Sequence, residues 1–348
     1  MGQKDTRRSL GLCFACAVLP WLAAPLVQAH EDSAPVLFIE LNDLFTGVYR
    51  DDYDQPGQLH VVTLNLNQFF DDVDNGNDEK VLSTRRFQRR VDSVAKSLGD
   101  EGSLPHIIAL QEIENTNALE HLAREIWRRY RIAYRLVLRA GQDVSGINLA
   151  YLVRGALQIV RVEQLFADQL LEYDGSPLFS RPPLLLEACR GESCFSLINL
   201  HLRSMRGIDS AEHGERVAHK RRQQAETIAA WCNRLLQKDP NTSLLLLGDF
   251  NALTPTDAHV DIAGILRGDP DNRNTRWPAR DLIEPDLIDL TLRIPAERRY
   301  SFVYRQRKQQ LDYMLVNRTF AAELESIEFG RIDRRLSDHA LLRARFRL

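Results

Sequence analysis

The sequence predicts an α/β fold in which two mixed β-sheets pack face to face, with helices on their outer faces, as a four-layer α/β sandwich. Strand-like apolar runs outnumber helical ones along the 348 residues. Several of these runs follow one another across short polar turns, which favours antiparallel pairing over repeated parallel crossovers. Amphipathic helices lie between other runs, and their apolar faces need a sheet to cover.

The first residues have the pattern of an export signal. A basic start precedes an apolar run, and Ala29 closes a cleavage site of small residues, which predicts a signal peptide of residues 1–29. A membrane anchor is the weaker alternative, because Pro20 and Pro25 interrupt the apolar run. We therefore expect a secreted or periplasmic protein with one domain, residues 30–348, and no membrane integration after cleavage.

The charge balance argues against binding through a broad cationic surface. The formal net charge of the chain is −3, and loss of the signal removes more basic than acidic groups. Contacts with nucleic acid are therefore expected to be local and assisted by metal. The pair Arg7 and Arg8 fits twin-arginine export and an ordinary signal equally well.

The secondary structure follows from the spacing of apolar residues. Phe87, Val91 and Leu98 belong to a helical repeat, as do Ala225 and Leu236 in a later segment. Helices are expected at residues 87–98, 114–130 and 225–236. Strands are expected at residues 59–66, 106–112, 132–138, 147–153, 183–189, 194–202, 243–250, 310–317 and 339–346.

Two cysteines bracket the short turn between expected strands. Cys189 and Cys194 can form a hairpin disulfide in an oxidising compartment, and two reduced thiols near a sheet edge are the alternative. Cys232 lies on the apolar side of a helix, which predicts a place in the core.

Polar residues recur where apolar strands end or begin. Because sheet scaffolds hold their sites at strand ends and in the loops beyond, these residues are candidates for one common site. They are Asn65, Glu112, His201, Asp249, Asn251, Asp312, Asp338 and His339.

The alternation of side chains in two expected strands supports the expectation that these polar residues meet at one site. In a strand, successive side chains face opposite ways, so Asn199 and His201 share the face that Leu200 does not use. Asp249 and Asn251 are also two residues apart, so both can point into one cleft.

The ordered motifs LQEIEN, NLHLRS, GDFNA, LDYMLVN and SDHALL, together with Asn65, resemble those of a known family. The chain is similar to the endonuclease/exonuclease/phosphatase superfamily, in particular its exported bacterial nucleases and pancreatic-type deoxyribonucleases. The resemblance spans residues 61–346.

The resemblance implies a divalent metal ion, with Mg²⁺ expected and Mn²⁺ as a substitute. Glu112 would bind this ion, and Asn65 and Asp338 would complete its shell or hold its waters. A hard cation prefers such oxygen ligands. Asn67 lies two residues beyond Asn65 and is an alternative source of the amide.

The resemblance also implies the catalytic groups. Asp249 and Asn251 would orient the attacking water and the scissile phosphate. His339, held by Asp312, would act as general base or as a cationic phosphate clamp, and His201 would be a second imidazole near a phosphate oxygen. An aspartate beside an imidazole fixes its tautomer and keeps its pKa near the working pH.

Other polar residues are candidates for contacts with substrate. Asn148 could contact phosphate as the family's central amide does, and Arg203 lies close to His201 in the chain. The basic residues Lys220, Arg221 and Arg222 could grip phosphates, although a solvated helix face is the favoured interpretation.

The acidic segment 71–79 could hold Ca²⁺ as a structural ion. No register of this segment reproduces the alternating ligands and glycine of an EF-hand loop, so a dedicated calcium site is not the favoured interpretation.

The leading functional hypothesis is a monomeric, metal-dependent nuclease that cleaves DNA, and also RNA in a broader version. The first alternative keeps the chemistry and acts on phospholipid headgroups or inositol phosphates. The second is a binding module or adhesin without activity, which the complete set of site residues disfavours.

Overall fold

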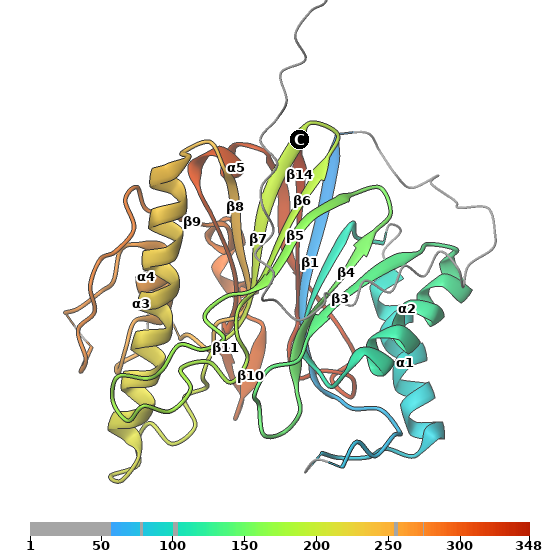
Figure 1. Ribbon diagram of the computed structural model, residues 1–348, viewed down its shortest axis with the longest axis horizontal. Helices are drawn as coiled ribbons and strands as arrows, with labels where there is room; N and C mark the ends of the chain where they lie inside the picture. Colours follow the sequence, from blue (N-terminus) through green and yellow to red (C-terminus); the bar gives the residue numbers. More distant parts are fainter. Residues whose placement is uncertain (1–56, 77–78, 100–103, 254–256, 274) are drawn as a thin grey trace, which may run out of the picture. The chain divides into compact units, whose positions relative to one another are not determined.

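The computed structural model describes residues 57–76, 79–99, 104–253, 257–273 and 275–348, so the expected signal peptide lies outside the described residues. Within them, two six-stranded sheets pack together, and helices cover their outer sides (Figure 1). The expected four-layer α/β sandwich is confirmed. None of the helices in this part of the chain combines the length and apolar character that a membrane crossing requires.

The first sheet carries the N-terminal strands and the last two strands of the chain. Its order is β13 (Leu324–Gly330), β14 (Leu341–Arg347), β1 (Gln58–Phe69), β2 (Ile107–Ile113), β4 (Asn148–Arg154) and β3 (Tyr134–Arg139). Only β1 and β2 pair in parallel among these neighbours, because α1 (Thr84–Gly99) carries the chain back between them.

The second sheet repeats this plan. Its order is β5 (Gln158–Gln164), β6 (Leu184–Arg190), β7 (Ser193–His201), β8 (Ser243–Asp249), β12 (Asp312–Val316) and β9 (Ile288–Asp289). The long helix α3 (Gly214–Lys238) makes the crossover between the parallel strands β7 and β8, and the other neighbours are antiparallel. In each sheet the two parallel strands therefore finish at the same end of the sheet.

Helices cover each sheet on one side. The helices α1 and α2 (Thr116–Tyr130) pack on the first sheet, and α3 and α4 (Ile262–Arg267) pack on the second (Figure 1). The remaining short elements are the 3-10 helices Leu290–Arg293 and Ala296–Arg298, β10 (Phe302–Tyr304), β11 (Arg307–Gln309) and α5 (Arg318–Ala322).

The strands keep their apolar residues in three layers because their side chains alternate. In β1, Leu64 and Leu66 face α1 and α2, whereas Leu59 and Val61 face the second sheet. All four side chains are fully buried. The layer between the sheets is therefore largely apolar.

The expected helices and strands are present, the short helices α4 and α5 were not expected, and there are two further differences. The helix α3 begins at Gly214, well before the expected residue 225, because its first turns have basic side chains that hide its apolar repeat. The strands β5, β9, β10, β11 and β13 were not expected, since they are short or largely exposed.

The hairpin of β6 and β7 contains the expected disulfide. Cys189 and Cys194 are register partners and their sulfur atoms are bonded. Cys232 is buried in the core, as expected.

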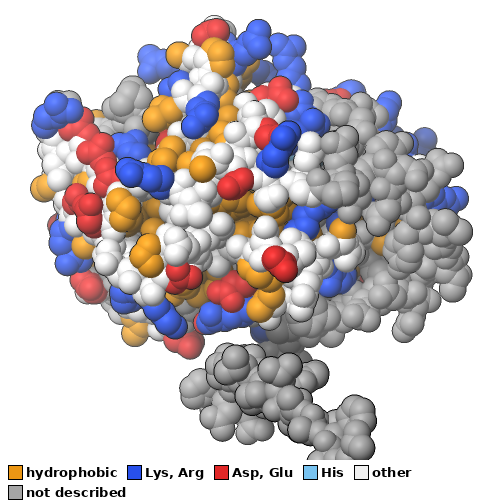
Figure 2. Space-filling view, turned by 90° about the horizontal axis from the view of Figure 1, so that it is seen from above, with side chains coloured by type: hydrophobic (Ala, Val, Ile, Leu, Met, Phe, Trp, Pro, Cys, Tyr) orange, Lys and Arg blue, Asp and Glu red, His pale blue; other side chains and the backbone are white. Residues whose placement is uncertain are grey.

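Figure 2 shows the end of the domain at which β14 finishes, which is opposite to the end where β1 and β8 finish. Basic, acidic and apolar side chains are intermingled on this face. Among the described residues in this view, no large patch of a single charge is visible, as the nearly balanced composition leads one to expect.

Candidate active site

Three polar residues lie in a row across the second sheet. Asp249 is the register partner of His201 on β7 and of Asp312 on β12. Side chains at such positions share one face at spacings of about 5 Å. This face looks toward the first sheet, because Leu247, two residues before Asp249, packs between the sheets. The pairing of strands alone therefore assembles half of the site.

The first sheet contributes its residues through a break in regular pairing. Asn65 faces the space between the sheets, but Glu112 follows Gln111 and would alternate onto the helix-covered side. The register shifts between Gln111 and Ile113, and Glu112 has a φ of 62°. This bulge turns the Glu112 carboxylate back toward Asn65.

The amide of Asn65 joins the two sheets. Its Nδ2 donates to Glu112 Oε1 at 3.0 Å and to Asp249 Oδ2 at 3.1 Å. The backbone N–H of Gln68 donates to Glu112 Oε2 at 2.7 Å and holds the other carboxylate oxygen. Asn67, the alternative amide, is exposed and donates its backbone N–H to Asn65 Oδ1, so Asn65 is the amide in the site.

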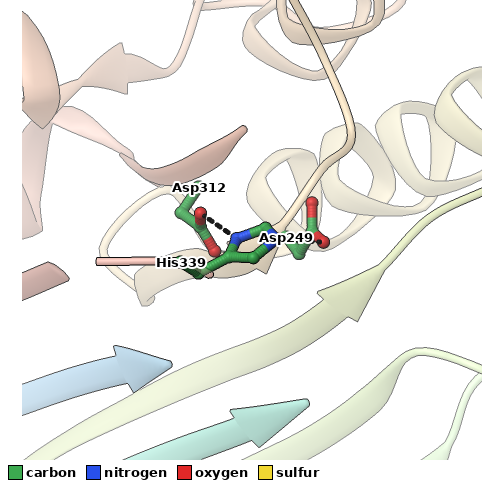
Figure 3. A group of neighbouring side chains, drawn as sticks. All are labelled: Asp249, Asp312 and His339. Atoms are coloured by element: carbon green, nitrogen blue, oxygen red, sulfur yellow. Dashed lines mark hydrogen bonds and ion pairs between the residues drawn. The ribbon is translucent and has the colours of Figure 1, made fainter. Parts of the chain in front are cut away.

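His339 reaches the second sheet from the loop before β14. Its Nδ1 lies 2.7 Å from Asp312 Oδ2, and its Nε2 lies 3.8 Å from Asp249 Oδ2, so the imidazole stands between the two carboxylates (Figure 3). Ser337 Oγ accepts from the His339 N–H and donates to the Asn65 carbonyl. The ring of Phe302 lies beside the imidazole, with centroids 5.2 Å apart.

His201 completes the group on the other side of Asp249. Its Nε2 lies 3.6 Å from Asp249 Oδ2 and 3.9 Å from Glu112 Oε1. The two histidines therefore flank one carboxylate, and both are less than a tenth exposed.

The surroundings of the site raise the pKa values of Asp249 and His339, which favours their protonated forms. Burial raises the pKa of Asp249 to about 7, and the charge of Asp312 adds to this effect. Burial opposes protonation of His339, but Asp312 and Asp249 outweigh it and raise the pKa of His339 to about 10. Burial lowers the pKa of His201 well below its ordinary value, which keeps that imidazole neutral.

The donor set fits a divalent cation. Glu112 Oε1 and Asp249 Oδ2 share one amide nitrogen, so two carboxylate oxygens lie close together, as hard cations require. Asp249, Asp312 and His339 also offer ligand atoms that lie within 4.8 Å of one another. Because Asp312 already holds His339 Nδ1, the oxygens of Glu112 and Asp249 are the better ligands.

Two expected site residues lie apart from this group. The Asp338 side chain is exposed, because the buried Ser337 and His339 turn it outward, and within the described residues it makes no hydrogen bond or ion pair. Its charge still helps to raise the pKa of His339. Asn148 donates both Nδ2 hydrogens to the carbonyls of Glu114 and Gly146, so its amide group holds a loop.

Asn251 lies at the wall of the site. Its N–H donates to Asp249 Oδ1 at 2.8 Å, and its side-chain Nδ2 donates to the Leu202 carbonyl at 3.0 Å. These bonds orient the Asp249 carboxylate and tie the end of β8 to the end of β7.

The interpretation of Lys220 and Arg221 as a solvated helix face is wrong. They are 7% and 1% exposed, and Arg221 forms a buried ion pair with Asp257 at 3.0 Å. Arg222 is half-buried and donates to the carbonyl of Pro278. Basic residues rarely occupy interior positions without a partner, and the sequence does not reveal that partner.

The acidic segment 71–79 is tied to the start of α2 by hydrogen bonds. Asp71 is fully buried and accepts from the side chains of Asn115 and Asn117. Residues 77 and 78 of this segment lie outside the described residues.

Sequence reasoning missed four residues that support the site. Ser337 could have been found, because it directly precedes the Asp-His pair. Gln68 acts through its backbone, and Phe302 and Arg181 lie in segments without a motif. Arg181 Nε approaches the His201 carbonyl at 3.5 Å and adds to the lowering of the His201 pKa.

Such an arrangement suits hydrolysis of a phosphate ester, which needs positive charge at the phosphate oxygens and proton transfer at the water and the leaving group. A model of the endonuclease/exonuclease/phosphatase family matches residues 61–341, and the chain belongs to this family. The protein is therefore a phosphodiester hydrolase. No curated protein matches the chain in sequence.

Solved structures share the fold at low sequence identity. Truncated Caenorhabditis elegans TDP2 is 15% identical with a TM-score of 0.53, and 84% of this chain and 98% of that chain are covered. TDP2 of D. rerio, complexed with single strand DNA product, is 14% identical with a TM-score of 0.54 over 84% and 99% of the two chains. The Neisseria 3′ phosphatase NExo, bound to a product DNA hairpin, is 19% identical with a TM-score of 0.50 over 83% and 99%.

Proposed function

We propose that the protein is an exported, divalent-metal-dependent nuclease that hydrolyses phosphodiester bonds of DNA. The observation that carries this proposal is the meeting of Asn65, Glu112, Asp249, His201 and the pair of Asp312 and His339 between the two sheets. These groups come from five strands and one loop, and each has a chemical part in the reaction.

Asp249 and His339 have different roles in the reaction, one as a proton acceptor and the other as a cation. Asp249 Oδ2, which Asn65 holds and which both histidines flank, can accept the proton of an attacking water. His339, with a pKa raised to about 10, remains an imidazolium and can bind a phosphate oxygen or protonate the leaving oxygen. A metal ion held by Glu112 and Asp249, whose oxygens Asn65 brings together, would supply further positive charge to the phosphate.

The choice of nucleic acid as substrate is supported by the solved relatives. Two of the similar structures hold DNA, one as a single strand product and one as a product hairpin. A DNA strand places its phosphodiesters on an exposed backbone, where an enzyme can reach them.

Export is supported by the segment of residues 1–29 and by the disulfide of Cys189 and Cys194, which is typical of an oxidising compartment. Sequencing of the mature N-terminus after expression of the full chain tests this part. His30 as the first residue supports it, and an intact Met1 in the cytoplasm contradicts it.

The nuclease activity is tested with the purified protein and supercoiled plasmid DNA. We expect degradation with Mg²⁺ or Mn²⁺ and none with a chelator. Asp249→Asn should lower the rate about 10²- to 10⁴-fold, since it removes a proton acceptor. The matched control is Asp271→Asn, which removes an exposed carboxylate paired with Arg273 and should keep the activity.

A parallel panel of RNA, sphingomyelin and inositol phosphates gives the outcomes that would contradict the proposal. Hydrolysis of a lipid headgroup or inositol phosphate with intact DNA assigns the protein to the alternative substrate class. Degradation of DNA in the presence of chelator refutes the dependence on metal.

A further inference from the structure

A hollow lined by basic side chains lies beside the active site. A hollow of about 590 Å³ is lined by Arg203, Arg206, Gly207, His213 and Arg216. Arg181 and Lys220 act electrostatically on the same arginines. We refer to Arg181, Arg203, Arg206, Arg216 and Lys220 as the cationic cluster.

The positive charge of the cationic cluster is only partly neutralised. Asp143 pairs with Arg181, and Asp174 pairs with Arg216. Within the described residues, Arg203 and Arg206 form no ion pair with a carboxylate; the Arg203 guanidinium donates to Ser204 Oγ and to the Arg206 carbonyl.

Lys220 has a neutral hydrogen-bond partner, so its positive charge is not neutralised. Lys220 Nζ donates to the Pro177 carbonyl at 2.8 Å. At the rim, Glu212 pairs with His213 at 3.5 Å, but its side chain is 82% exposed and therefore largely screened by water. The hollow thus keeps an excess of positive charge.

The crowding of like charges is unfavourable without a bound anion. Burial and the neighbouring charges of Arg181 and Arg216 lower the pKa of Arg203. Burial, followed by the charges of Arg216 and Arg203, lowers the pKa of Lys220 to about 8. An anion in the hollow would relieve this repulsion.

The hollow is tied to the catalytic residues by a buried arginine. Arg203 is two residues beyond His201, so their Cα atoms are at most about 7 Å apart. Arg221 Nη1 donates to the carbonyls of Arg203 at 2.7 Å and Asn251 at 2.9 Å. The loop that carries Arg203 is therefore held in a fixed position relative to the end of β8.

The direction of α3 adds to the positive potential. This 25-residue helix begins at Gly214, next to the lining residue His213, and Figure 1 shows its first turns at the end of the domain where β1 finishes. The His213 side chain makes no capping hydrogen bond. The partial positive charge of the helix N-terminus thus reinforces the arginines.

We propose that the hollow binds a second phosphate group of the substrate, next to the phosphate that is hydrolysed. This inference rests on the proposed nuclease function and makes molecules with at least two phosphates the preferred substrates. An internal phosphodiester of a strand and a terminal phosphate monoester share the chemistry that the arginines recognise.

The test compares a short oligonucleotide with bis(4-nitrophenyl) phosphate, which has a single phosphate. Arg206→Gln should lower the ratio of kcat/KM for the oligonucleotide to that for the single-phosphate ester about tenfold, through loss of a charged hydrogen bond. Arg206 is exposed and forms no ion pair within the described residues, so folding should be preserved. Arg206→Lys should restore most of the ratio.

Arg124→Gln is the matched control, because it removes an exposed arginine of α2 that pairs with Glu120. Its ratio should equal that of the unsubstituted protein. An Arg206→Gln ratio equal to the control ratio overturns the second phosphate site, and so does a Gln variant that loses both activities equally.

Binding gives an independent measurement. In an Asp249→Asn background, Arg206→Gln should weaken binding of a labelled oligonucleotide about tenfold. The slope of log affinity against log salt should fall by about 0.7, the value for one lost phosphate contact on a single strand. An unchanged affinity and slope contradict the proposal.

Oligonucleotides with and without a terminal phosphate separate the two sources. A tenfold loss with both substrates supports an internal phosphate, and a loss only with the phosphorylated substrate supports a terminal one. Failure of the nuclease function has a different signature, because the unsubstituted protein would then hydrolyse the single-phosphate ester and no oligonucleotide.

Discussion

At the scale of single residues, the active site is surrounded by unusual backbone conformations. Asn67, Gln68, Glu112 and Asn251 have φ angles of 48°, 57°, 62° and 51°. Such conformations cost about 1–3 kcal/mol each for residues other than glycine, with asparagine at the low end. They persist because they aim the Glu112 carboxylate and the Gln68 N–H at one another.

One buried histidine outside the site should make stability depend on pH. Burial, and then the charge of Arg345, lower the pKa of His60 from 6.5 to about 3. As the pH falls below 6.5, the unfolded chain binds a proton that the folded chain refuses. The contribution of His60 to the free energy of unfolding is therefore fully present above pH 6.5 and is lost as the pH falls toward 3. At pH 5 the loss is about 2 kcal/mol.

Urea unfolding at pH 7 and pH 5 measures this effect. His60→Phe removes the titrating group and should reduce the loss of unfolding free energy between the two pH values. His213→Gln, at an exposed histidine, should leave the loss as it is. An equal loss in the His60 variant and the unsubstituted protein would refute the prediction.

The candidate site could be predicted well from sequence where strand alternation decides the geometry. His201, Asp249 and Asp312 follow from the ends of apolar runs and meet as register partners. The choice between Asn65 and Asn67 could not be made, because it depends on a bulge and on positive φ angles that leave no mark in the apolar pattern.

At the scale of elements, the close pairing of the parallel strands β7 and β8 depends on one glycine. Gly248 has a φ of 128°, and a Cβ at this position would lie 2.2 Å from the Leu200 carbonyl oxygen. Only glycine allows the strands to approach so closely just before Asp249.

Gly248→Ala should therefore destabilise the fold by more than about 2 kcal/mol and displace Asp249, with loss of activity. Gly155→Ala is the control, since a Cβ there meets nothing within 4 Å. Urea unfolding and plasmid cleavage of both variants check the prediction, which fails if the two variants behave alike.

The prediction of elements from sequence succeeded for long amphipathic or apolar segments and failed elsewhere. The core of α3 was predicted from Ala225 onward, but its first turns were not, because Lys220 and Arg221 are buried against loops instead of a sheet. The strand β5 is an exposed sheet edge, so it lacks the clear alternation of a half-buried strand.

At the scale of the whole molecule, a polar bridge joins the two sheets beneath the site. Gln111 Nε2 donates to Thr63 Oγ1 and to Asn199 Oδ1 at 2.7 Å. Asn199 Nδ2 donates to the carbonyls of Leu110 and Ala150 on the first sheet. These bonds fix how the sheets lie against each other in an otherwise apolar layer.

Asn199→Val should destabilise the protein by about 3 kcal/mol or more, because Gln111 and two buried carbonyls lose a partner. Gln158→Val, on the exposed strand β5, should change stability by at most about 0.5 kcal/mol. Chemical unfolding of both variants decides the matter, and similar values for the two would disprove the role of the bridge.

The division of the site between distant parts of the chain bears on how the protein could be split. A cut at the exposed turn of Gly155, between β4 and β5, leaves Asn65 and Glu112 on one fragment and Asp249 and His339 on the other. Neither fragment alone has the complete set of reacting groups. Recovered hydrolysis would then report reassembly, so this fold has the layout of a complementation sensor.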